Sequence, residues 1–224
     1  MTAVPVSTGE VVSRVTALRA RIDAITDGRD VRIVAVTKGF DVTAPRAAMT
    51  AGLTMLGENY AQELVAKDDA LDADERALAQ WHFIGRLQRN KVKLLAGRIA
   101  VWQSVDRAEL LDEIARRAPS AVVMVQVDLS GEPQKGGAPF ADVPALVARG
   151  RDLGLDVCGL MGVGPAGPAE AARPGFRSLV ALADELGLRE RSIGMSHDLE
   201  VAVEEGATLV RVGTALFGDR PPRS

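Results

Sequence analysis

Short apolar runs alternate with amphipathic segments along almost the whole chain. The first run, residues 31–36 (VRIVAV), is apolar at nearly every position, as in a strand buried on both faces of a parallel sheet. Seven further runs follow, at residues 53–57, 81–85, 98–103, 121–129, 155–163, 191–195 and 208–213. Between the runs, apolar residues recur at three- and four-residue steps, which predicts helices.

This alternation predicts the fold class. Eight strands alternating with helices, without a second zone of composition, indicate an α/β protein with a single (β/α)8 TIM-type barrel over residues 1–224. An open doubly wound sheet is the alternative. An extra helix is predicted before the first strand, because Ser7 to Glu10 has the pattern of a capping box. Its apolar positions at helical spacing are Val11, Val15, Leu18, Ile22 and Ile25.

Composition is that of an ordinary globular protein, with 47% apolar and 25% charged residues and a net charge of -3. No apolar stretch reaches the length of a membrane span, and the N-terminus lacks the pattern of a signal peptide. A single cysteine, Cys158, excludes an internal disulfide framework, and its place inside a strand indicates buried packing. We therefore expect a cytoplasmic monomer that does not bind membranes.

Basic residues are scattered among acidic ones, so the sequence has no charged patch typical of nucleic-acid binding. The densest basic run is residues 86–93, RLQRNKVK. We interpret this run as a solvated helix start, with a nearby phosphate as a further hypothesis.

Lys38 ends the first strand, and Gly39 follows it. The chain has five lysines and twenty-two arginines, so arginine is its usual source of positive charge. Lysine, unlike arginine, can lose its proton and attack a carbonyl. From these residues alone two hypotheses stay open: Lys38 is a reactive amine, or it is a strand-end charge in contact with water.

Small residues follow the last two predicted strands, where TIM-type barrels often bind phosphate. Ser196 is predicted at a helix N-terminus, where its hydroxyl and nearby backbone amides suit an anion. Gly213 and Thr214 begin the last short helix, and glycine permits close approach of a phosphate to the backbone. Each signal is weak by itself, because glycine and serine usually serve turns and caps.

Five motifs then occur in order between Val31 and Gly218: AVTK, GENYAQE, WHFIGRLQRNK, SIGMSHD and VRVGTALFG. Together they closely resemble the pyridoxal-phosphate homeostasis protein family, which shares the barrel of bacterial alanine racemase. The resemblance implies a single barrel that carries pyridoxal 5'-phosphate (PLP) as a Schiff base on the lysine of the first strand, Lys38.

The resemblance also implies roles for other residues. It puts Asn59 and His82 beside the cofactor, and Ser196, Gly213 and Thr214 around its phosphate. Arg211 would face the pyridine nitrogen, where a guanidinium disfavours ring protonation and weakens the electron sink of this cofactor. The alternatives are a salt bridge at the barrel end for Arg211 and a hydrogen-bonded core position for His82.

Two residues need separate comment. The family commonly has serine where Thr37 stands, which removes no proposed ligand. Lys135 lies in the glycine-rich segment 130–139. It either receives or passes on cofactor or is a solvated loop lysine, and the second interpretation is favoured.

Three functions compete. The first is that of a non-catalytic protein that buffers PLP and delivers it, with PLP-dependent apoenzymes as possible partners. The alternatives are a PLP-dependent amino-acid racemase and a Schiff-base aldolase that uses lysine alone. In alanine racemase a tyrosine from a second domain supplies the opposing base. This chain ends at Ser224, and its only tyrosine is Tyr60. We therefore expect the first function, and assign no catalytic residue and no metal ligand.

Overall fold

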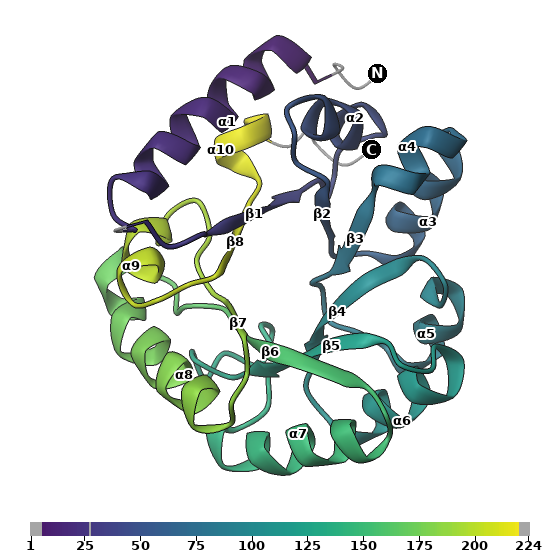
Figure 1. The fold of residues 1–224 in the computed structure, drawn as a ribbon, viewed down its shortest axis with the longest axis vertical. Coiled ribbons are helices and arrows are strands. Elements are labelled where there is room, and N and C mark those ends of the chain that lie inside the picture. The colour runs from purple at the N-terminus through teal and green to yellow at the C-terminus, as the bar shows by residue number, and fades with distance from the viewer. Residues whose placement is uncertain (1–5, 27, 220–224) are drawn as a thin grey trace.

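Across residues 6–26 and 28–219, which the computed structural model describes, eight parallel strands close into a barrel. Each strand pairs with the next along the chain, and β8 pairs with β1. Helices surround the barrel on its outside (Figure 1). The predicted (β/α)8 barrel is therefore confirmed, and the open doubly wound sheet is excluded.

The strands are β1 Arg32–Val36, β2 Met55–Glu58, β3 Gln80–Phe83, β4 Ile99–Val105, β5 Val122–Val127, β6 Asp156–Gly162, β7 Glu190–Ser192 and β8 Leu209–Val212. The helices are α1 Thr8–Asp23, α2 Thr43–Thr50, α3 Ala61–Ala70, α4 Ala73–Leu78, α5 Arg89–Leu95, α6 Ala108–Arg117, α7 Val143–Asp152, α8 Arg173–Glu185, α9 Leu199–Glu204 and α10 Thr214–Phe217. Two 3-10 turns, η1 Phe140–Asp142 and η2 Ala169–Ala172, precede α7 and α8.

Strand β1 shows why the strands are apolar at consecutive positions. Ile33 and Ala35 belong to the large core between the barrel and its helices. Val34, between them, packs in a second buried cluster with Met124 and Leu209 from β5 and β8. Because successive side chains point to opposite faces of a strand, both faces of β1 must be apolar.

The N-terminal helix α1 is present as predicted. Its buried residues are Val11, Val15, Leu18 and Ile22, and it lies beside α10 at the edge of the barrel (Figure 1). The predicted capping box at Ser7 is wrong, because the Ser7 side chain makes no cap hydrogen bond. A capping box does form between Asp72 and Glu75 at the start of α4. Among the described helices, none combines the length and the apolar character needed to span a bilayer.

The chain after β7 differs from the sequence prediction. We expected a helix from about Ser196, but α9 begins at Leu199. Residues 195–198 form a turn instead, in which the Met195 backbone amide donates to Asp198 Oδ1 at 2.6 Å. The buried Asp198 side chain therefore organises the turn, and Ser196 lies in the loop after β7.

Candidate functional site

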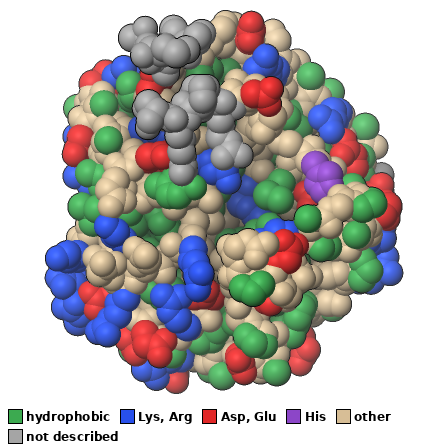
Figure 2. Space-filling view, turned by 180° about the vertical axis from the view of Figure 1, so that it is seen from behind, with side chains coloured by type: hydrophobic (Ala, Val, Ile, Leu, Met, Phe, Trp, Pro, Cys, Tyr) green, Lys and Arg blue, Asp and Glu red, His purple; other side chains and the backbone are tan. Residues whose placement is uncertain are grey.

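A cavity of about 380 Å³ lies where the chain leaves the C-terminal ends of the strands. Figure 2 shows a hollow in one face of the molecule, with Lys or Arg side chains inside it. The volume lies in the range of about 300–1,000 Å³ that is usual for small-molecule sites. Six of the seven sequence-predicted residues line this cavity: Lys38, Asn59, Ser196, Arg211, Gly213 and Thr214.

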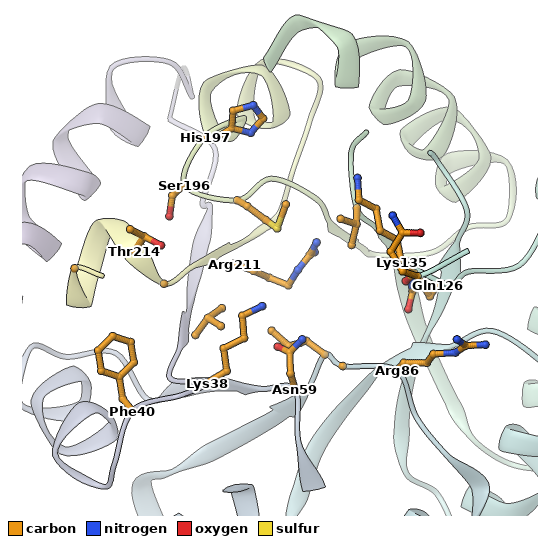
Figure 3. A pocket seen from close by; sticks show the side chains of 18 residues that line it. Lys38, Phe40, Asn59, Arg86, Gln126, Lys135, Ser196, His197, Arg211 and Thr214 are labelled. Carbon is orange, nitrogen blue, oxygen red and sulfur yellow. The ribbon is translucent and has the colours of Figure 1, made fainter. Parts of the chain in front are cut away.

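Lys38 enters the cavity directly after β1. The chain turns at Gly39, whose φ of 78° lies in the left-handed region that favours glycine. The side chains of Lys38, Asn59 and Arg211 converge on the same part of the cavity (Figure 3). The strand thus delivers a partly buried amine to a space that also contains an amide and a guanidinium.

Ser196, Gly213 and Thr214 form one side of the cavity. The Ala215 backbone amide donates to Ser196 Oγ at 3.4 Å, which joins the loop after β7 to the start of α10. The Ser196 and Thr214 hydroxyl groups lie near each other in Figure 3. A Cβ atom on Gly213 would lie 3.2 Å from the Val36 carbonyl oxygen, so glycine lets the end of β8 approach β1 closely.

Arg211 lies at the bottom of the cavity, and 4% of it is exposed. Its Nη1 donates to the Ser192 carbonyl at 2.6 Å and to Ser192 Oγ at 2.8 Å, and its Nη2 donates to the Gly162 carbonyl at 2.8 Å. Burial lowers the pKa of Arg211 to about 10, and Asp198 acts in the opposite direction. The guanidinium therefore stays charged at neutral pH in a fixed orientation.

His82 lies below the cavity and is not part of its described lining. Its Nδ1 and the Gln103 amide nitrogen are 2.7 Å apart, and Gln103 Oε1 accepts a 2.7 Å bond from Ser192 Oγ. A buried chain of hydrogen bonds thus runs from His82 to Arg211. Burial, with a smaller effect of Arg32, lowers the pKa of His82 to about 4, so the ring is neutral at pH 7 and Nδ1 accepts from Gln103. This is the hydrogen-bonded core position that the sequence left open as the alternative.

Asn59 lies between β2 and α3. Its backbone packs so closely on Gly85 that a Cβ at position 85 would lie 2.1 Å from the Asn59 carbonyl oxygen. Its side-chain Oδ1 is buried and has no hydrogen-bond partner among the described residues. Since Asn59 lines the cavity, this unpaired oxygen lies within the cavity wall.

The structure adds Phe40 and Gln126, which the sequence did not assign, and Arg86, the first residue of the basic run for which a nearby phosphate was a hypothesis. Gln126 had a signal, because it is a polar residue near the end of the apolar run in β5. The favoured interpretation of Lys135 as a solvated loop lysine is wrong. Lys135 lines the cavity, and its ammonium donates to Glu132 and, at 2.9 Å, to the Gly164 carbonyl.

The arrangement fits PLP. An amine that can condense with an aldehyde, hydroxyl groups that can donate to a phosphate and a guanidinium that is charged at neutral pH all face one cavity of suitable volume. The buried acceptor on Asn59 offers a further polar contact. This donor set matches the aldehyde, the phosphate and the ring nitrogen that PLP presents.

Comparison with known proteins agrees with this chemistry. The family model of the alanine racemase N-terminal domain matches residues 13–221. The pyridoxal phosphate homeostasis protein of Aquifex aeolicus is 45% identical over 182 residues, 75% of this chain and 78% of that protein. The protein of the same name from Pseudomonas aeruginosa is 40% identical over 215 residues, 91% of this chain and 92% of that protein.

A solved structure resembles the chain over nearly its full length. The structure of PipY from Synechococcus elongatus with PLP bound has a TM-score of 0.83 and 32% sequence identity, and the match covers 93% of this chain and all of that one. The chain therefore belongs to the alanine racemase N-terminal domain family, and within it to the group of pyridoxal phosphate homeostasis proteins.

Proposed function

We propose that the protein binds PLP in the cavity at the strand ends and holds it as a Schiff base on Lys38. One observation carries the proposal: an amine at the end of β1 shares a cavity with the Ser196 and Thr214 hydroxyl groups. PLP has an aldehyde and a phosphate on one ring, so a single molecule can engage both sides. The names of the relatives and the PLP bound to PipY support the proposal.

Each residue has a defined part in this binding. The Lys38 amine would hold PLP through its aldehyde carbon, with water as the leaving group. Ser196, Gly213 and Thr214 would hold the phosphate, Asn59 would contact a polar substituent of the ring, and Arg211 would face the ring nitrogen. When bound, PLP supplies a reactive aldehyde and an electron-accepting ring. His82 lies below this site and is bonded to Gln103, which accepts from Ser192, and Ser192 in turn accepts from Arg211.

The physiological role that follows is storage and delivery. A reversible Schiff base keeps a reactive aldehyde from other amines and still releases it. We propose that the whole chain acts as one unit in the cytoplasm, as a monomer, and that it supplies PLP-dependent apoenzymes without strong catalytic activity of its own.

The test is borohydride reduction of the protein loaded with PLP, followed by mass mapping. One pyridoxyl group is expected on Lys38, and Lys38→Ala should abolish the labelling. Lys135→Ala is the matched control, because Lys135 is a second lysine that lines the same cavity, and labelling should persist in that variant. Label found mainly on Lys135 or Lys91 would overturn the assignment.

A further inference from the structure

A cluster of charged side chains lies behind Lys38, on the other side of the barrel wall from the cavity. Glu58 ends β2 and is fully buried, and Lys67 in α3 is 4% exposed. The two side chains form an ion pair, and Glu63 Oε2 lies 3.8 Å from Lys67 Nζ. Burial raises the pKa of Glu58, while Lys67 and Thr37 act in the opposite direction.

Stability alone does not account for such a pair. Removing two charges from water costs several kcal/mol per ion, and apolar residues of similar volume often stabilise a fold at least as well. The partners of the cluster give a more specific reason for its presence.

The cluster holds the backbone on both sides of Lys38. The ammonium of Lys67 donates to the Thr37 carbonyl at 2.8 Å, and the Thr37 hydroxyl donates to Glu58 Oε1 at 2.8 Å. On the other side, the Gly39 backbone amide donates to Glu63 Oε2 at 2.8 Å. These contacts involve the peptide group before Lys38 and the peptide group after it. Since φ and ψ of a residue set the orientation of its two neighbouring peptide groups, both dihedrals of Lys38 are held by charged partners.

We propose that Glu58, Glu63, Lys67 and Thr37 are positioning residues for Lys38, which fix its Cα–Cβ direction toward the cavity before a ligand arrives. The proposal rests on the function proposed above, in which Lys38 is the lysine that binds PLP. Two backbone hydrogen bonds also hold this segment, from the Thr37 amide to the Gly57 carbonyl and from the Phe40 amide to the Thr37 carbonyl. Neither of them involves the peptide group after Lys38, so without the charged partners binding would have to order Lys38 itself. Fixing the backbone of one residue costs about 1–2 kcal/mol, which corresponds to a roughly 5- to 30-fold change in affinity.

The chain offers graded variants. Glu63→Ala removes the acceptor of the Gly39 amide, and Glu63 is exposed enough (32% of its side chain) for the protein to remain folded. Glu63→Gln keeps an acceptor oxygen there and should rescue the effect. Thr37→Val removes the hydroxyl that donates to Glu58, and Thr37→Ser restores it.

Asp68→Asn is the matched control. Asp68 follows Lys67 on α3 and is also buried, but its side chain binds Trp81 Nε1 at 3.0 Å and Arg98. The Asp68→Asn substitution should lower the melting temperature without changing the amide exchange around Lys38 or the affinity for PLP.

Two measurements test the proposal. In the cofactor-free protein, amide hydrogen exchange of a peptide covering residues 36–40 should be faster in Glu63→Ala and Thr37→Val than in Asp68→Asn or the wild type. With PLP, the absorbance of the Schiff base should give a larger dissociation constant in the same two variants, up to the roughly 5- to 30-fold that corresponds to releasing the whole residue, with recovery in Glu63→Gln and Thr37→Ser. The proposal is overturned if both variants exchange and bind like the wild type, or if Asp68→Asn shows the same losses. If the wild-type protein itself gives no label on Lys38, the proposed function fails, and the exchange measurement still decides whether the cluster holds residues 37–39.

Discussion

Replacing Ser196 by alanine tests the phosphate side of the cavity. The Ser196 hydroxyl lines the cavity and accepts from the Ala215 amide at 3.4 Å. A bond of that length lies at the weak end of the range, so its loss should change the melting temperature little. A hydrogen bond from the hydroxyl to a charged phosphate contributes about 1.5–3 kcal/mol. Ser196→Ala should therefore weaken PLP binding by about 10- to 150-fold.

The assay compares two ligands. The dissociation constants of PLP and of pyridoxal, which lacks the phosphate, are measured for the wild type and for Ser196→Ala from the absorbance of the Schiff base. The wild type should prefer PLP by at least about an order of magnitude, the effect of one charge-assisted hydrogen bond. The substitution should reduce that preference and leave pyridoxal binding nearly unchanged.

Ser178→Ala is the control for the loss of a hydroxyl group. Ser178 is exposed on α8, and its Oγ donates to the Pro174 carbonyl, one turn earlier in the same helix. Equal affinity of the wild type for PLP and pyridoxal would refute the phosphate site. An equal loss of affinity for both ligands in Ser196→Ala would show that the residue acts through the shape of the loop and not through the phosphate.

Two further predictions concern His82 and catalysis. Burial lowers the pKa of His82 to about 4, from an ordinary value of about 6.5, so the unfolded chain takes up this proton first as the pH falls. From pH 7.5 to pH 5 the free energy of unfolding, measured with urea, should therefore drop by about 2 kcal/mol more in the wild type than in His82→Gln. An equal drop in the two proteins would contradict this prediction. Alanine incubated in deuterated water with stoichiometric PLP-loaded protein should show little α-proton exchange and almost no inversion, because a guanidinium at the ring nitrogen, the place proposed for Arg211, disfavours ring protonation and weakens the electron sink. Repeated turnover with inversion would instead identify the protein as a racemase.

The barrel could be predicted because its signal is local. Consecutive apolar residues in each strand report burial on both faces, and the helices between them have ordinary amphipathic spacing. The start of α9 was misplaced because Ser196 and Asp198 are both residue types that precede helices. Periodicity does not distinguish between two such positions two residues apart. The structure does, through the bond from Met195 to Asp198.

The depth of His82 could not be predicted from its motif. Inward-facing residues alternate along a strand, so His82 and Ile84 both point into the barrel. The cavity is lined by Ile84, Gly85 and Arg86, whereas His82 lies one layer below. Which of the two layers meets a ligand depends on how far each strand extends relative to its neighbours, and no local pattern reports that.

The ion pair between Glu58 and Lys67 had a signal that could have been used. Lys67 lies three and six residues after Leu64 and Ala61, on the apolar face of α3, where an ammonium needs a partner. Glu58 ends a buried strand, and its carboxylate also needs an oppositely charged partner. The sequence could thus have suggested that Glu58 and Lys67 pair with each other. It could not have suggested that Lys67 binds the Thr37 carbonyl and Glu58 the Thr37 hydroxyl, next to Lys38.

Two sets of buried contacts hold the charged groups of the cavity from outside it. Lys67 and Glu63 bind the backbone on either side of Lys38, and Glu58 binds Lys67 and the Thr37 hydroxyl. Ser192 and the Gly162 carbonyl bind Arg211. Substitutions of these positioning residues should therefore change both stability and PLP affinity. They remove buried contacts, and they also leave Lys38 or Arg211 less ordered. A substitution on the partly exposed wall of the cavity, such as Ser196→Ala, should change affinity with little effect on stability. A plot of the change in melting temperature against the change in dissociation constant therefore separates two groups of residues: those that contact the ligand, and those that position the contacting residues.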